Sequence, residues 1–173
     1  MKRAFPLLLL AAMLTMAPMA KAVQMDVGFS PFGESLDLVL SGINSAQESI
    51  LVAAYAFTSK PIALALLSAH KRGVKVRVVA DMRANNRRYT AVTFLANQGV
   101  PVRLNNHYAI LHDKFMVIDG KDVETGSFNY SAAAVTKNAE NVLMLRDVPE
   151  LAAKYAAEWQ RLWDEGQDVE KRY

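Results

Sequence analysis

The 173-residue chain contains no cysteine. Disulfide bonds, structural zinc knuckles, iron–sulfur clusters and cysteine nucleophiles are therefore excluded. Apart from one run at the beginning, the chain also lacks long hydrophobic stretches. Its 52% apolar and 21% charged residues are ordinary for one globular domain with a single core. This composition excludes a disordered tail, a collagen-like repeat and a coiled coil.

The first 22 residues show the pattern of a secretory signal peptide. Lys2 and Arg3 precede an apolar run over residues 4–16, and the small-residue triplet 20–22 follows. A membrane anchor is the alternative, but about 13 apolar residues are too few to span a bilayer, which needs about 20. We expect cleavage before Val23, a single mature domain over residues 23–173, and a periplasmic or secreted location.

The mature chain carries no net charge. Three basic residues belong to the signal segment, so 17 basic and 17 acidic residues remain. Bulk charge gives no argument for a polyanionic partner, and any such argument has to come from local clustering. No later stretch approaches the roughly 18 apolar residues of a membrane helix. We therefore expect no stable membrane association after signal cleavage.

Apolar runs alternate with helical patterns along the mature chain. Strands are expected over residues 27–29, 50–57, 74–80, 100–104, 112–118, 123–126 and 141–145. Helices are expected over 35–46, 89–97, 127–137 and 149–163, and a further helix between a cap at Thr58 or Ser59 and a C-cap at Gly73. Asp119-Gly120 predicts a hairpin turn between two of the strands. The expected fold class is α/β, an α/β/α sandwich with a mixed, mostly parallel central sheet.

The stretch from Leu111 to Asp119, followed by Gly126 to Asn129, carries the chemistry. Side chains two positions apart on a strand share a face, so His112 and Lys114 should project together. The hairpin should then return Ser127 and Asn129 to the same end of the sheet. A nucleophile or acid, a cation and two neutral polar side chains would converge there.

Such a cluster is typical of a phosphate site. Lys114 supplies positive charge, Ser127 and Asn129 supply hydrogen-bond donors, and the start of the helix expected over 127–137 adds backbone N–H groups. His112 is able to bond to phosphorus or to donate a proton. No carboxylate cluster or second histidine lies at a metal-ligand spacing, so we expect metal-independent chemistry with no cofactor.

The string His112-x-Lys114-x4-Asp119-x6-Gly126-Ser127-x-Asn129 resembles the HKD signature of the phospholipase D superfamily. Chain size, the signal pattern and the single motif copy resemble the small secreted bacterial endonucleases of that superfamily. The resemblance implies hydrolysis of phosphodiesters in two displacements through a phosphohistidine. It also implies a homodimer, because a chain with one motif needs a second chain to supply the second histidine.

The resemblance implies a role for each motif residue. His112 is the nucleophile in one protomer and the acid/base in the other. Lys114 and Asn129 neutralise the non-bridging oxygens, and Ser127 belongs beside them. Glu140 is expected to accept a hydrogen bond from the far nitrogen of His112. Asp119 lies an odd number of residues from His112, so we expect it to have a structural role.

A basic, amide-rich loop is a second candidate for contact with substrate. Arg83, Arg87 and Arg88 suit the wall of a groove that follows a nucleic-acid backbone, although a solvated helix start explains them equally well. His107 lies in a polar loop near the motif and is a further candidate.

These observations favour a sequence-nonspecific endonuclease that acts on DNA, with RNA left open. A phospholipase D-type phospholipid hydrolase is the alternative enzyme, although the loops near the site carry amides and arginines rather than apolar residues. A non-catalytic phosphate-binding protein is a third reading, which the intact His112, Lys114 and Asn129 disfavour.

Overall fold

The computed structural model describes residues 22–86 and 90–171, and strands and helices alternate through this part. The elements are β1 (Gln24–Ser30), α1 (Glu34–Ser45), β2 (Ser49–Ala54), α2 (Lys60–Lys71), β3 (Lys75–Asp81), α3 (Ala91–Asn97), β4 (Val102–Asn105), β5 (Phe115–Ile118), β6 (Asp122–Gly126), α4 (Ala132–Thr136), β7 (Glu140–Arg146), α5 (Pro149–Asp164) and β8 (Gln167–Asp168).

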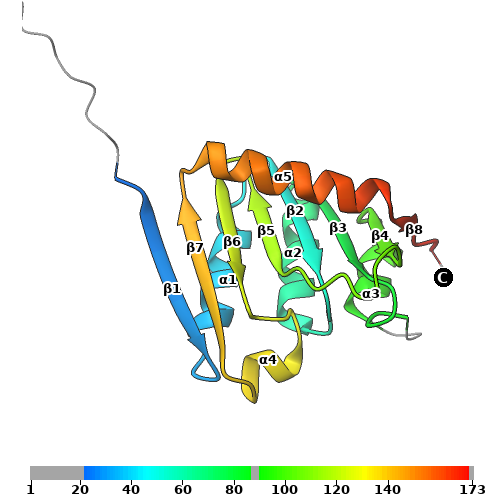
Figure 1. Ribbon diagram of the computed structural model, residues 1–173, viewed down its shortest axis with the longest axis horizontal. Helices are drawn as coiled ribbons and strands as arrows, with labels where there is room; N and C mark the ends of the chain where they lie inside the picture. Colours follow the sequence, from blue (N-terminus) through cyan, green and yellow to red (C-terminus); the bar gives the residue numbers. More distant parts are fainter. Residues whose placement is uncertain (1–21, 87–89, 172–173) are drawn as a thin grey trace, which may run out of the picture.

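Within the described ranges the strands form one eight-stranded sheet in the order β1-β7-β6-β5-β2-β3-β4-β8 (Figure 1). The α/β class and the mixed sheet are thus confirmed. The expectation of mostly parallel pairing is wrong, because only β2–β3 and β3–β4 are parallel among the pairs so described. The connection between β5 and β6 is a tight hairpin, and parallel pairing would require a long crossover.

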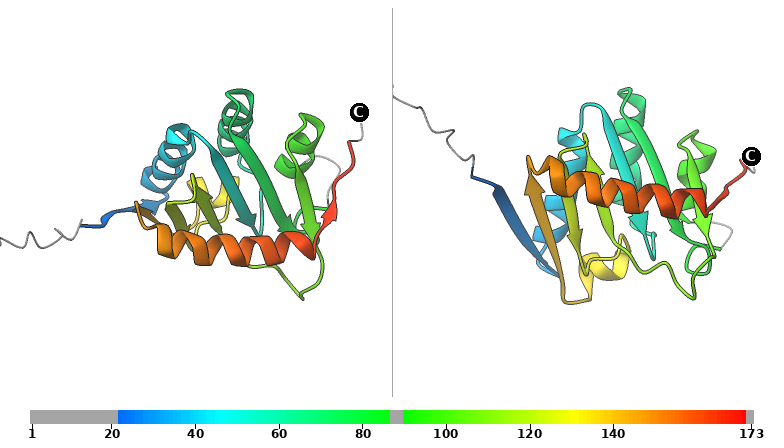
Figure 2. Two further views of the ribbon diagram at one scale, coloured as in Figure 1. Left: turned by 90° about the horizontal axis from the view of Figure 1, so that it is seen from above. Right: turned by 45° about the horizontal axis from the view of Figure 1, so that its top comes forward.

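Helices cover both faces of the sheet, which confirms the three-layer arrangement. Helices α1, α2 and α3 lie on one face and α5 crosses the other (Figure 2). Ile43, Leu66 and Leu95 are fully buried in the core beneath the three helices, while Trp159 and Leu162 of α5 fill the second core. Burial of these apolar stripes is the main stabilising term for such a layered domain.

β2, β5 and α4 each lose residues that the sequence predicts for them, and the missing parts lie at the same end of the central strands. β2 stops at Ala54, β5 begins only at Phe115, and α4 covers five residues. Side chains from the end of β3 form hydrogen bonds with the backbone beside β2 and β5, as described below. This end of the sheet holds the candidate site.

No helix among residues 22–86 and 90–171 combines the length and the apolar character that crossing a membrane requires. The signal peptide expected over residues 1–22 falls, except for its last residue, outside the described part of the chain.

Candidate active site

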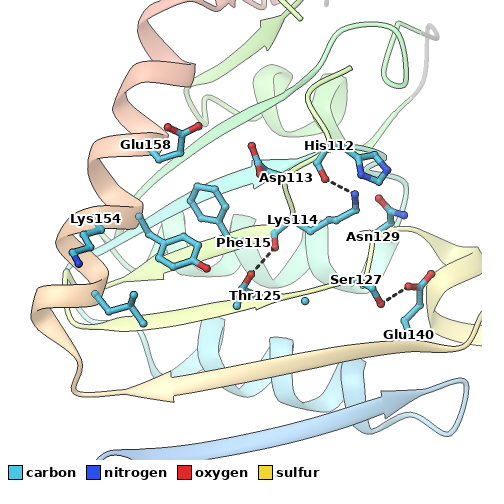
Figure 3. Close-up of a pocket in the computed structure, with 13 residues that line it drawn as sticks. His112, Asp113, Lys114, Phe115, Thr125, Ser127, Asn129, Glu140, Lys154 and Glu158 are labelled. Atoms are coloured by element: carbon cyan, nitrogen blue, oxygen red, sulfur yellow. Dashed lines mark hydrogen bonds between the residues drawn. The ribbon is translucent and has the colours of Figure 1, made fainter. Parts of the chain in front are cut away.

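The groove that contains the motif has a volume of about 810 Å³ and lies at the end of the sheet where β6 ends (Figure 3). Residues from both motif segments meet residues of α5 around it. Its lining includes His112, Asp113, Lys114, Phe115, Thr125, Gly126, Ser127, Asn129, Glu140, Leu151, Lys154, Tyr155 and Glu158. The sequence prediction that the hairpin gathers His112, Lys114, Ser127 and Asn129 at one place agrees with this geometry.

Lys114 is the cation beside His112 in the groove, and it is only 7% exposed. Its ammonium group donates to the backbone carbonyl of His112 and lies 5.3 Å from the ring centroid of Tyr55. Burial lowers the pKa of Lys114, against the opposing attraction of Asp113 and Glu140. The group is therefore a partly desolvated positive charge directed into the groove.

His112 is exposed to the groove on one side and covered by an aromatic ring on the other. The centroid of the Tyr55 ring lies 4.8 Å from that of the imidazole, with an angle of 54° between the planes. Neither His112 nor Lys114 belongs to a strand, contrary to the expectation for residues 112–118. The Asp81 carboxylate holds the backbone just before them, since it accepts from the N–H of Leu111 at 2.8 Å.

Sequence reasoning missed Tyr55. The available signal was its position at the end of the apolar run 50–57, the edge where the carboxyl ends of parallel strands place functional groups. An aromatic residue there has no chemical signature of its own. Only the contact with His112 and Lys114 reveals it.

Asn129 reaches the groove from a loop that a glycine makes possible. A Cβ at Gly126 would overlap the carbonyl oxygen of Asn141, so only glycine permits the approach of β6 to β7 at this point. The Oδ1 atom of Asn129 is buried, with no hydrogen-bond partner in the described part of the chain. An amide oxygen only accepts hydrogen bonds, so Asn129 would meet a phosphate oxygen through its Nδ2 donor rather than through this atom.

Ser127 and Glu140 bind each other rather than His112. The Ser127 hydroxyl donates to Glu140 Oε2 at 2.7 Å and accepts from the N–H of Asn141 at 3.1 Å. Glu140 Oε1 accepts from Asn138 at 2.9 Å. The hydrogen bond expected between Glu140 and His112 is not made within the described chain, since both carboxylate oxygens of Glu140 point to its own loop. The hydroxyl proton of Ser127 is likewise committed to Glu140.

The helix terminus expected beside Ser127 also lies elsewhere. α4 begins at Ala132, and its first backbone donors are served by Ser131, whose hydroxyl accepts from the N–H of Ala134 at 3.2 Å. The N–H of Ser131 itself donates to the carbonyl of Asn129 at 2.7 Å. The prediction that a helix start adds an anion site at Ser127 is therefore wrong.

Asp119 lies at the opposite end of β5 from the groove. Its carboxylate accepts from the backbone N–H groups of Gln47, Glu48 and Ser49, at 2.8–3.2 Å. Burial raises its pKa, but these three donors and Lys121 outweigh that effect and leave the pKa below its ordinary value. The contacts give Asp119 the structural position that we expect, although the reason is its place at the far end of β5 rather than strand parity with His112.

A buried acid lies beneath the loop that carries Ser127 and Asn129. Glu124 of β6 is 1% exposed and accepts a hydrogen bond from the hydroxyl of Tyr130, which is also fully buried. The carbonyl of Tyr130 accepts from the N–H groups of Thr58 and Ser59 at 2.9 and 2.8 Å. Burial raises the pKa of Glu124 to about 8 despite the hydrogen bond from Tyr130.

The side of the groove next to α5 carries charges of both signs, from Asp113, Lys154 and Glu158. Burial, and to a smaller extent the carboxylate of Glu158, raise the pKa of Asp113. Lys154 is the cation on this side. Figure 3 shows Lys154 and Glu158 on α5, apart from the cluster formed by His112, Lys114 and Asn129.

Two of the other substrate-binding candidates, Arg83 and His107, do not line the groove. Arg83 donates to the carbonyl of Ala109 at 3.0 Å and thus ties down the loop that precedes the motif. His107 makes an edge-to-face contact with Tyr108, with 4.9 Å between ring centroids, and does not line the groove. Arg87 and Arg88 lie outside the described residues.

Within residues 22–86 and 90–171, no group of three or more histidine or acidic side chains is placed to hold a metal ion. The groups that do face the groove are an exposed imidazole, a desolvated ammonium and a carboxamide. An imidazole beside fixed positive charge suits attack on a phosphorus centre or proton transfer to a leaving oxygen. Fold and site together define a protein of the phosphoryl-transfer class.

The chain belongs to the phospholipase D-like family: residues 39–163 match the family model described as "Cardiolipin synthase, PLD-like domain". Among solved structures it is similar to Nuc, a phospholipase D family member from Salmonella typhimurium, with 43% identity, a TM-score of 0.84, and coverage of 86% of this chain and 99% of that one. NucT from Helicobacter pylori is 30% identical with a TM-score of 0.77, over 86% of this chain and all of that one.

Among curated proteins the chain is similar to the phospholipase D of Rickettsia conorii, with 37% identity over 131 residues. That match covers 76% of this chain and 65% of the relative, so the chain spans about two thirds of the length of this protein. A mitochondrial cardiolipin hydrolase from Canis lupus familiaris is 33% identical over 78% of this chain and 53% of its own length.

The buried acid generates a prediction about pH and stability. Because the pKa of Glu124 is higher in the folded than in the unfolded state, the folded state retains a proton that the unfolded state loses between about pH 4.5 and 8. This group therefore lowers the free energy of unfolding progressively as the pH rises through that window. In Glu124→Gln, a neutral isostere, that decline is absent.

Urea denaturation of both proteins at pH 5, 7 and 8.5 measures the difference. We expect stabilities within about 1 kcal/mol at pH 5, where Glu124 is protonated, and a more stable variant at pH 8.5. Parallel curves for the two proteins across the range would contradict the raised pKa.

Proposed function

We propose that the protein is a metal-independent phosphodiesterase, and that it acts as a sequence-nonspecific endonuclease. The convergence of His112, Lys114 and Asn129 on one open groove carries this proposal. Every polar group in that cluster addresses a phosphate or its leaving group, and none is arranged to read a base. The similarity to Nuc over nearly the whole length of that protein supports the assignment.

The proposed reaction has two displacements at phosphorus. A ring nitrogen of His112 attacks, a P–N bond forms, and the P–O bond to the leaving group breaks while the partner subunit's His112 protonates the departing oxygen. That second imidazole then takes a proton from water, whose oxygen attacks phosphorus and breaks the P–N bond. Lys114 and Asn129 stabilise the charge on the non-bridging oxygens in both steps.

The proposed homodimer accounts for an uncovered apolar surface. Met25, Val27 and Phe29 of β1 are 62%, 57% and 51% exposed. Met25 pairs with Leu145, which packs against the α5 core, so these side chains lie on the α5 face of the sheet. α5 does not extend over β1 (Figures 1 and 2). A contiguous exposed apolar face of this kind indicates an interface, and a second copy of the chain supplies the missing histidine from the same side.

Phospholipid hydrolysis is the second candidate. The names of the Rickettsia and canine relatives, phospholipase D and cardiolipin hydrolase, support it. The same cluster would attack either phosphodiester, so the substrate assay has to include both classes.

We also propose that the chain is exported to the periplasm or beyond, on the strength of the charged, apolar and small-residue pattern of residues 1–22.

The first prediction from this proposal concerns the nucleophile. Purified mature protein in excess EDTA should cleave plasmid DNA, and His112→Ala should lose at least about 1,000-fold in rate because no other group can form the covalent intermediate. DNA retention by the variant should remain. Phosphatidylcholine and cardiolipin vesicles serve as parallel substrates, and faster turnover of the vesicles than of DNA would favour the second candidate. Activity that EDTA abolishes and a divalent ion restores would contradict the metal-free mechanism.

A second prediction concerns the composite site. Wild-type and His112→Ala chains are mixed in equal amounts under conditions of subunit exchange. Each mixed dimer that forms then contains one His112 instead of two. If both histidines are required, activity follows the square of the wild-type fraction and falls to about one quarter. A fall to one half would mean that each subunit works alone.

A third prediction concerns the interface. Val27→Glu places a charge in the uncovered face and should halve the solution mass and abolish nuclease activity together. Leu64→Glu is the matched control, because Leu64 is similarly exposed, at 46%, but lies on α2 on the opposite face. Light scattering and the nuclease assay measure both quantities. A monomeric Val27→Glu protein with full activity would contradict the dimer.

A further inference from the structure

The ring of Tyr55 forms a common wall behind two groups of the site. The imidazole of His112 lies on it at 4.8 Å between centroids, and the ammonium of Lys114 lies 5.3 Å from its centroid. Tyr55 is half-buried and is not among the residues that line the groove. It therefore touches the groups that would react and lies behind them.

A buried amide holds the backbone of Tyr55 in place. Asn85, 2% exposed, donates through its Nδ2 to the carbonyl oxygens of Tyr55 at 2.6 Å and Asp81 at 2.8 Å. Its Oδ1 accepts from the N–H of Phe57 at 3.0 Å. These bonds replace the ladder bonds that β2 would otherwise make, which explains why the strand ends at Ala54. Such a satisfied buried network fixes one local conformation.

The end of β3 also fixes the segment that precedes His112, which packs against the ring of Tyr55. Asp81, likewise 2% exposed, accepts from the N–H of Leu111 at 2.8 Å and from that of Ala84 at 2.7 Å. Leu111 immediately precedes His112. Two adjacent buried side chains, Asp81 and Asn85, thus set the distance between the ring of Tyr55 and the backbone that carries the imidazole.

We propose that Tyr55 is a positioning residue, which holds the imidazole of His112 and the ammonium of Lys114 in one fixed geometry; this rests on the proposed phosphodiesterase function. An imidazole at an exposed position otherwise samples several rotamers, and only some of them aim a ring nitrogen at phosphorus. Contact of the ammonium with the ring face keeps the charge partly desolvated, where it acts more strongly on phosphate oxygens. The ring is required for both effects and the hydroxyl for neither.

A base-stacking role for Tyr55 makes a different prediction. Aromatic side chains that stack nucleobases contribute to substrate binding and hence to KM. A positioning role acts on the geometry of the reacting groups and hence on kcat. The two roles therefore separate in the kinetics of one pair of variants.

The experiment compares Tyr55→Leu, which removes the ring, with Tyr55→Phe, which retains it. We expect kcat on plasmid DNA and on bis-p-nitrophenyl phosphate to fall at least about tenfold in Tyr55→Leu, with KM changed less than about twofold. Tyr55→Phe should stay within about threefold of the wild type. Urea unfolding midpoints of the three proteins control for a loss of folded protein. An unchanged kcat in Tyr55→Leu, or a rise in KM alone, would overturn the proposal.

A measurement independent of activity tests the geometry. The chain has three histidines, so the imidazole resonances of His112 can be assigned by comparison with His112→Ala. The ring current of Tyr55 should shift them in the wild type and in Tyr55→Phe, and the shift should vanish in Tyr55→Leu. A wild type inactive on every phosphodiester would refute the proposed function itself. An active wild type with unchanged kcat in Tyr55→Leu would refute only the role of Tyr55.

Discussion

The site depends on one positive charge, the ammonium group of Lys114, which lies just before the central strand β5 and is bonded to no carboxylate among the described residues. Lys114 is 7% exposed, and its contacts in the described chain are a backbone carbonyl and an aromatic ring. Burial of a charge that is not ion-paired is unfavourable, which is why its pKa is lowered. An anion that enters the groove relieves that penalty. The protein therefore carries the electrostatic component of phosphate recognition before any substrate arrives, and partial exclusion of water makes it effective.

Residues at the ends of β3 and β6 keep Lys114, His112 and Asn129 in place. On one side Asp81 and Asn85, at the end of β3, determine where Tyr55 and Leu111 lie. On the other, Gly126 allows β6 to approach β7 so closely that the next residues turn toward the groove. Beneath that turn the Glu124–Tyr130 pair joins it to the start of α2. The reactive groups lie on irregular backbone, yet each segment is tied to a rigid strand, which is the arrangement that positions catalytic groups accurately.

Local patterns in the sequence predicted the layers, the hairpin at Asp119-Gly120 and the meeting of His112 with Asn129, because each depends on the period of neighbouring residues. They did not predict that most strand pairs are antiparallel, because the direction of pairing depends on the order in which strands distant in the sequence lie in the sheet. Nor did they predict the partner of Glu140 or the end of β2. The bond between Asn85 and Tyr55 joins residues 30 positions apart, and no residue near either of them signals it. The alternation of Met25, Val27 and Phe29 is visible in the sequence, but only the length and path of α5 reveal that nothing in the described chain covers them.

A single chain leaves the apolar face of β1 uncovered and supplies only one motif histidine, His112. The proposed dimer would cover the face and supply the second histidine. A phosphoryl transfer in two displacements needs a nucleophile and a separate proton donor on opposite sides of phosphorus, and His112 cannot occupy both positions at once. A two-fold axis duplicates whatever lies near it, so one exposed histidine beside the axis becomes an opposed pair. The apolar residues of β1 supply the burial that holds such a pair together. In the proposed dimer the chain needs no second motif, because symmetry would provide it, and the proposed mechanism requires that His112 be exposed.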